Sequence, residues 1–190
     1  MKPCLKYSCL ILLLCFSSGA GAQVPFQPRR LGLSSSPKSF GLILDTDSNR
    51  KEKTFNSYAL FLDCYQLLSG EEEKPGYKAS YSHNTIIRQG YLNEGMVYFL
   101  YAGSGGVLGY VRDYSSATHK NRGLELGLTA GGGILLAFKD SNWEIGLSFL
   151  AEFALHIRQD ESVSHKTDLS WYANGLFRAP LPMLNVYYRF

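Results

Sequence analysis

The sequence is poor in cysteine, in net charge and in long hydrophobic runs. Its formal net charge of +3 over 190 residues argues against a strongly basic nucleic-acid-binding protein and against an acidic disordered chain. No segment after residue 22 reaches the length of about 18 uninterrupted apolar residues that a membrane-spanning helix requires. Gly-x-Ser-x-Gly, His-Glu-x-x-His and P-loop patterns are also missing. We therefore expect no nucleic-acid partner, no cofactor, no metal site and no catalytic residues.

The first 22 residues have the layout of a secretory signal peptide. Lys2 and Lys6 precede the apolar stretch 10–16, and small residues at 20–22 provide an A-x-A cleavage site. Cleavage after residue 22 would leave Cys64 as the remaining cysteine and bring the net charge of +3 to +1. One cysteine forms no internal disulfide and no Cys₄ zinc site. The alternative, a lipoprotein acylated at Cys15, is disfavoured because the preceding Leu14 is not small.

The rest of the chain is dominated by a period of two. Residues 23–37 are rich in Pro and Ser without a period, which predicts a flexible leader. From Trp143 to Arg158 every odd position is apolar, and from Leu124 to Phe138 the even positions are nearly all apolar. Residues 139–142 form a turn between them. The strands of this hairpin are about 15 residues long, whereas the usual strand has about 5–6 residues. Strands of this length are ordinary in membrane barrels.

Weaker alternation extends the pattern to eight predicted strands. They cover residues 38–46, 55–67, 77–89, 94–103, 106–113, 124–138, 143–158 and 182–190. We expect tight turns at 103–106 and 139–142, and longer polar links at 47–54, 114–122 and 159–181. Short turns at one end and long loops at the other are typical of outer-membrane barrels. Two links do not fit this asymmetry, namely 68–76, which is long, and 89–93, which is tight.

The last seven residues carry a resemblance to a known family. Apolar and aromatic residues alternate at positions 184, 186, 188 and 190, and the chain ends on Phe190. This resembles the C-terminal signature of outer-membrane β-barrels, and residues 38–190 look like a small barrel of the OmpA/OmpX type. The resemblance implies an all-β, eight-stranded antiparallel up-and-down transmembrane β-barrel in a Gram-negative cell envelope. It also implies recognition of Phe190 by the barrel-assembly machinery and contact with outer-membrane lipid.

Parity divides the strand residues into two faces. We expect the lumen face to carry a network of polar residues, namely Glu125, Glu144, Glu152, His156, Arg158 and Arg189. Further basic residues, Lys78, Arg88 and Arg112, would join this network. Charges in a narrow lumen must be paired, which predicts a structural plug rather than a conducting thread. The face expected to meet lipid contains Trp143, Phe149, Phe153, Leu184, Val186 and Tyr188. Tyrosines at strand ends, including Tyr65, Tyr77, Tyr91, Tyr110, Tyr114 and Tyr188, would form aromatic girdles.

The functional prediction is an integral outer-membrane protein with a structural, adhesive or surface-interaction role and a closed or narrow lumen. One alternative is a soluble periplasmic lipid-binding barrel of lipocalin-like construction, because periodicity alone does not say which face is inside. The other is an outer-membrane lipid-modifying enzyme. That enzyme would need a nucleophile beside a histidine base. Glu152 and His156 lie about 13 Å apart along one strand, too far for a direct hydrogen bond.

Overall fold

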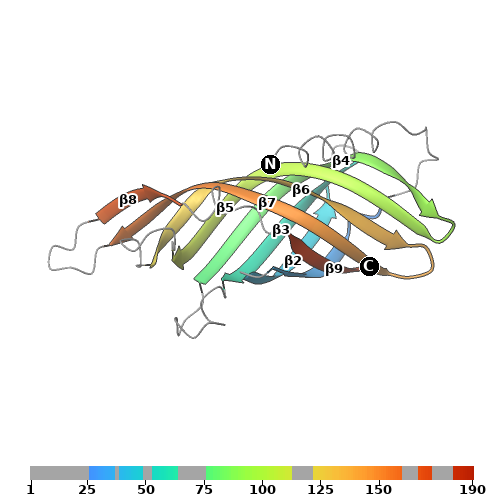
Figure 1. Ribbon diagram of the computed structural model, residues 1–190, viewed down its shortest axis with the longest axis horizontal. Coiled ribbons are helices and arrows are strands. Elements are labelled where there is room, and N and C mark those ends of the chain that lie inside the picture. Colours follow the sequence, from blue (N-terminus) through green and yellow to red (C-terminus); the bar gives the residue numbers. More distant parts are fainter. Residues whose placement is uncertain are drawn as a thin grey trace, which may run out of the picture.

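The computed structural model (Figure 1) describes residues 26–36, 39–48, 53–63, 76–112, 122–159, 167–172 and 182–190. The predicted signal peptide over 1–22, and Cys64, lie outside these ranges. The strands are β1 (Arg30–Ser35), β2 (Ser39–Asp47), β3 (Thr54–Asp63), β4 (Gly76–Asn93), β5 (Met96–Arg112), β6 (Arg122–Phe138), β7 (Trp143–Gln159), β8 (Thr167–Trp171) and β9 (Met183–Arg189). No helix long and apolar enough to span a membrane occurs among the described residues.

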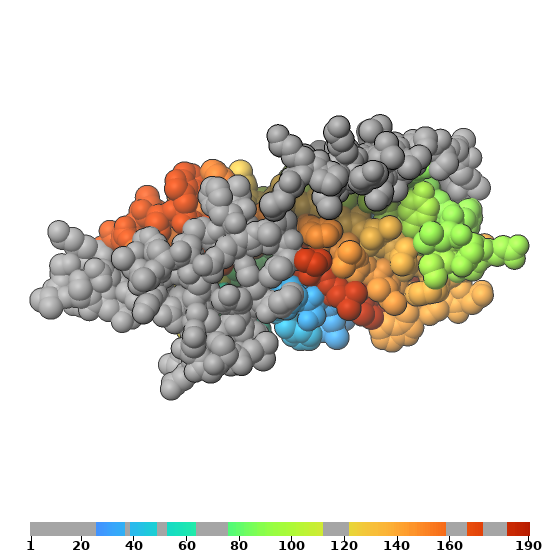
Figure 2. Space-filling model, in the orientation of Figure 1, coloured from blue at the N-terminus to red at the C-terminus, as the bar shows by residue number. Residues whose placement is uncertain are grey.

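The strands close into an antiparallel barrel with eight positions around its wall. Neighbours in sequence pair from β1 to β7, and β9 pairs with both β7 and β1, which closes the sheet. Figure 2 shows β9 and the first strands side by side on one face. The eighth position is shared, because β8 pairs with Leu155–Gln159 of β7 and β9 pairs with Trp143–Ser148. The predicted all-β, eight-stranded antiparallel barrel is confirmed.

The pairing register fixes the width of the barrel. A path across the strands starts at Trp143 and returns to β7 ten residues further on, at Phe153. It passes through Tyr188, Leu31, Leu44, Tyr58, Tyr81, Gly106 and Leu128. With eight strands and this shear, standard strand spacings give a tilt of about 40° and a radius of about 8 Å to the backbone. Side chains from opposite walls therefore meet in the lumen.

The structure corrects two strand boundaries. Arg30–Ser35, placed in the leader by their Pro/Ser-rich surroundings, form β1 and pair on both sides, so the barrel begins at residue 30 and not at 38. The predicted turn at 103–106 is wrong, because β5 runs without interruption from Met96 to Arg112. An added Cβ at Gly105 would lie 1.8 Å from the carbonyl oxygen of Tyr81 on β4. Glycine is present there because two backbones approach closely, not because the chain turns.

The corrected strands also explain the two links that did not fit. The β2–β3, β4–β5 and β6–β7 links span 48–53, 94–95 and 139–142, at the end where β1 begins and β9 finishes. Longer links, 64–75, 113–121 and 160–166, follow β3, β5 and β7 at the other end. Because β1 adds one strand before each early link, each of these links moves to the opposite end of the barrel. The link 64–75 then lies among the long links, and 94–95 lies among the short ones. The link 47–54 changes ends for the same reason. The short β1–β2 link, 36–38, remains an exception.

Alternation separates a lumen face from an outer face along each strand, as the burial pattern of β2 illustrates. A register shift between Ile86 and Arg88 interrupts the alternation in β4. Arg88 therefore pairs with Leu100 on the outer face, not in the lumen as parity had suggested. An apolar cluster fills the lumen near the short links, and it comprises Ile43, Phe55, Ala59, Phe61, Ile86, Val97, Phe99, Leu135, Ala137 and Tyr187.

Candidate functional site: polar clusters in the lumen

The first cluster surrounds Arg30, whose side chain is 1 % exposed. Its Nε donates to Asp45 Oδ2 at 2.6 Å, and its Nη1 donates to Glu144 Oε2 at 3.1 Å. The guanidinium also lies 4.9 Å from the ring centres of Phe26, Phe55 and Tyr187. Three rings and two carboxylates thus replace the water that a buried cation loses.

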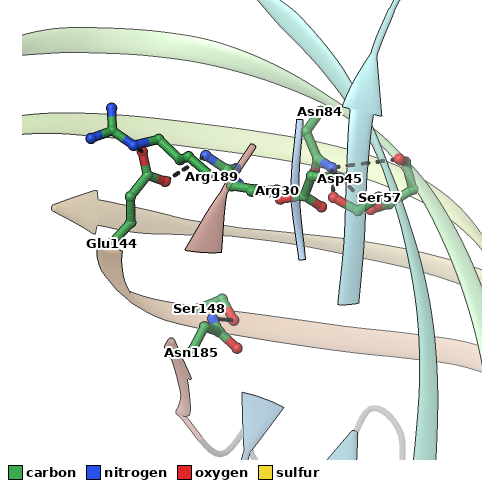
Figure 3. Close-up of polar contacts among 9 residues, drawn as sticks. Arg30, Asp45, Ser57, Asn84, Glu144, Ser148, Asn185 and Arg189 are labelled. Atoms are coloured by element: carbon green, nitrogen blue, oxygen red, sulfur yellow. Dashed lines mark hydrogen bonds and ion pairs between the residues drawn. The ribbon is translucent and has the colours of Figure 1, made fainter. Parts of the chain in front are cut away.

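Arg189 completes this cluster from β9. Its Nε lies 3.3 Å from Glu144 Oε1, so Glu144 bridges the two arginines, as Figure 3 shows. Arg189 also donates to the backbone oxygens of Phe138 and Ser141 in the β6–β7 hairpin. Two arginines and two carboxylates balance in charge. The cluster therefore ties the first strand, the last strand and the β6–β7 hairpin together at the end with the short links.

Neutral polar groups occupy the middle of the lumen (Figure 3). Asn84 donates to the hydroxyl of Ser57 at 2.9 Å, and Asn185 donates to that of Ser148 at 2.7 Å. A cavity of about 60 Å³ is lined in part by these serines, by Asn84 and by Gly103 and Gly131. Small residues on the surrounding strands leave this space, which is large enough for water and far smaller than usual ligand pockets of about 300–1,000 Å³.

The second cluster lies toward the end with the long links. Lys78 Nζ is 2.6 Å from Glu152 Oε2 and 3.4 Å from Glu125 Oε2. Lys78 also lies 4.6 Å from the ring centre of Tyr172, the residue that follows β8. Glu125 is fully buried, and this cluster sets two carboxylates against one ammonium. It joins β4, β6 and β7 across the lumen.

His156 lies beside this second cluster but contacts a backbone group. Its Nε2 is 3.0 Å from the carbonyl oxygen of Val111, and its ring centre is 6.0 Å from that of Tyr172. Arg158, two residues further along β7, pairs with Asp168 of β8. Among the described residues, no group of three or more His, Cys, Asp or Glu side chains has an arrangement that could hold a metal ion. The chemistry that the lumen residues offer is the pairing of acidic and basic side chains from different strands.

The six polar residues predicted for the lumen all lie on the lumen face, but in separate groups. Glu144 and Arg189 belong to the Arg30 cluster, Glu125 and Glu152 to the Lys78 cluster, and Arg158 pairs with β8. Arg30 was not predicted because it lies in the segment 23–37 that was expected to be a leader, and Asp45 was not predicted either. Parity could have indicated Asp45, since the outer positions 40, 42 and 44 are all apolar. The side chain of Arg112 lies outside the described residues.

The residues predicted to face lipid point away from the lumen. Side chains on this face are exposed at Trp143, Phe149, Phe153, Leu184, Val186 and Tyr188, and Phe190 is 70 % exposed. Tyr77, Tyr91 and Tyr110 are exposed as well, whereas Tyr65 and Tyr114 lie outside the described residues.

The chain was compared with family models, curated proteins and solved structures. No family model, no curated protein and no solved structure matches this chain. The class is therefore defined by the fold, a closed eight-stranded antiparallel β-barrel with paired charges inside. The resemblance to OmpA/OmpX barrels stays a prediction from the sequence pattern.

Proposed function

We propose that this protein is an integral outer-membrane β-barrel whose lumen is closed by ion pairs. The observation that carries the proposal is the polarity of the two faces. Among the residues that the structure describes, eleven polar or charged residues are buried, Arg30, Asp45, Glu125 and Glu144 among them, whereas thirty large hydrophobic residues are exposed. A soluble protein rarely exposes apolar patches beyond a few hundred Å². Lipid around the barrel would cover this surface.

The aromatic residues support the same arrangement. Trp143 and Tyr188 lie at the end with the short links and contact each other, with ring centres 5.3 Å apart. Phe153 and Trp171 pair at 4.6 Å further along β7. The ten residues from Trp143 to Phe153 correspond to about 25 Å along the barrel axis at this tilt. That distance equals the apolar band of about 25 Å between the aromatic girdles of outer-membrane barrels.

In this proposal the barrel anchors the chain and displays its longer links. A cleaved signal peptide over residues 1–22 would deliver it to the envelope, and the assembly machinery would recognise the terminal Phe190. The links 64–75, 113–121 and 160–166 would then face outside the cell, while the start of β1 and the finish of β9 would face the periplasm. The role would be structural or adhesive, with the partner bound by these links.

The lumen weighs against the alternative of a soluble lipid carrier. A lipocalin-like barrel encloses an apolar cavity for its ligand. Here the lumen holds Arg30, Lys78 and their carboxylates, and the cavity between them measures about 60 Å³. An acyl chain entering this space would displace the ion pairs and leave buried charges without partners.

The test combines fractionation with gel mobility before and after boiling. We expect the protein in the outer-membrane fraction, with a mobility shift on boiling that marks a closed, detergent-resistant barrel. Phe149→Arg, in the middle of the outer face of β7, should cost about 2–4 kcal/mol and block assembly. Phe149→Leu and Asp140→Arg, the latter in an exposed turn, serve as controls that should assemble normally. Recovery in the soluble periplasm without a shift would instead support the lipid carrier.

A further inference from the structure

A polar cluster interrupts the apolar outer face on β3 and β4. Asn56 Oδ1 accepts hydrogen bonds from Tyr81 OH at 3.2 Å and from His83 Nδ1 at 2.9 Å, and all three side chains are on the outside. Ser104, also exposed, lies opposite His83 on β5. The strand tilt places His83 about 10 Å along the axis from the level of Trp143. The cluster therefore lies between the two groups of aromatic residues and not at the rim.

The cluster has hydrogen-bonding groups left over. An amide oxygen only accepts, so His83 Nδ1 carries the hydrogen and Nε2 of the neutral ring presents a lone pair. The amide nitrogen of Asn56 has two hydrogens to donate. In the described part of the chain, neither Nε2 of His83 nor the amide nitrogen of Asn56 has a hydrogen-bond partner. Hydrocarbon would leave both groups unsatisfied at a cost in free energy.

An apolar hollow of about 750 Å³ adjoins the cluster. Its lining includes the large side chains of Leu60, Leu108 and Leu126 and small residues such as Ala79 and Gly106. Tyr81 belongs both to this lining and to the polar cluster. Small residues permit close approach between membrane proteins, and polar side chains then bond across the contact.

We propose that a second copy of this chain docks on this face, with the two barrels side by side in the same orientation. The inference rests on the proposed membrane insertion. Because both copies insert in the same direction, the twofold axis that relates them runs between the two barrels, parallel to the membrane normal. Like groups then meet at the same height. Nε2 of His83 in one copy accepts from the amide of Asn56 in the other, and the reverse pair forms by symmetry. A lipid tail could fill the hollow but has no group to satisfy His83.

Site-directed cross-linking in membranes tests the contact. In a Cys64→Ser background, we expect Ser104→Cys to form a dimer with a short bis-maleimide. Val186→Cys is the matched control, because it lies at a similar depth on β9, which is four strands from β4 and three from β5 around the barrel, and it should stay monomeric. Equal cross-linking at both positions, or none at Ser104→Cys, overturns the proposal.

Sedimentation equilibrium in detergent then separates the two parts of the face. His83→Leu should raise the dimer dissociation constant about tenfold or more. Gly106→Trp should do the same by filling the hollow, since an added Cβ there is 3.5 Å from its nearest neighbour, Gly127 O. A monomeric wild type with lipid bound, at all concentrations, would contradict the dimer. The boiling shift reports the barrel independently, so a folded monomer disproves only this inference.

Discussion

The fully buried Arg30 shows how single residues hold this barrel. It lies on the first strand, yet one of its partners, Glu144, is 114 residues away in sequence. Arg29, the preceding residue, points outward and pairs with Asp47 at 2.8 Å, with both side chains largely exposed. Two neighbouring arginines with similar partners thus differ mainly in burial, and burial decides how much each pair contributes.

We predict that Asp45→Ala destabilises the barrel by about 3–5 kcal/mol, because it leaves Arg30 with only the carboxylate that Arg189 also uses. The double variant Arg30→Met with Asp45→Ala should be less destabilised than the single variant, since the Glu144–Arg189 pair remains balanced. Asp47→Ala, the exposed control, should change stability by about 0–1 kcal/mol. Unfolding by urea in lipid vesicles measures all three. A double variant as unstable as Asp45→Ala would show that the ring contacts of Arg30 dominate.

At the scale of elements, β5 is the strand for which the sequence pattern gave the wrong prediction. Glycine at 103, 105 and 106 predicted a turn, but the strand continues through them between β4 and β6. Gly105 faces the lumen where a Cβ would meet the backbone of β4, whereas Gly106 faces outward, where a Cβ would make an ordinary van der Waals contact with Gly127 O at 3.5 Å. Neighbouring glycines in one strand therefore have different reasons to be glycine.

Substitution at these two positions separates the two reasons. Gly105→Ala should destabilise the barrel by at least about 1–3 kcal/mol, because a backbone oxygen at 1.8 Å must move. Gly106→Ala should stay within about 0.5 kcal/mol of wild type. The midpoint temperature of the gel-mobility shift compares them. A turn at 103–106 would instead make both variants similarly unstable.

At the scale of the whole molecule, the described strands form a narrow barrel with a charged cluster toward each end of the lumen. Eight strands and a shear of ten residues leave a radius of about 8 Å, into which side chains project from all sides. The Arg30 cluster lies toward one end and the Lys78 cluster toward the other, with a cavity of about 60 Å³ between them. If the lumen is closed as proposed, a solute would have to separate both sets of ion pairs to pass.

We therefore expect no stable conductance when the purified barrel is inserted into planar lipid bilayers. Proteoliposomes should likewise show no swelling in small sugars, with a wide porin as the positive control. Incorporation is verified on the same preparation by the mobility shift on boiling. A regular conductance step from the folded protein would mean that the ion pairs open readily, and it would contradict the proposed closure of the lumen.

The sequence alone determined which side chains share a face. The period of two along residues 124–138 and 143–158 placed Glu125, Glu144 and His156 together on one side, because alternate strand residues point in opposite directions. This local rule needs no knowledge of the partner strand. It also predicted the all-β class and the β6–β7 hairpin, which the structure confirms.

Only the tertiary structure decided which strands meet and in what register. The pairing of β1 with β9, the division of the eighth strand and the bulge that moves Arg88 outward all depend on contacts between segments far apart in sequence. So does the separation of the lumen charges into two clusters. Alternation specifies a direction for each side chain, whereas closure and shear specify its neighbours, and neighbours determine which charges pair.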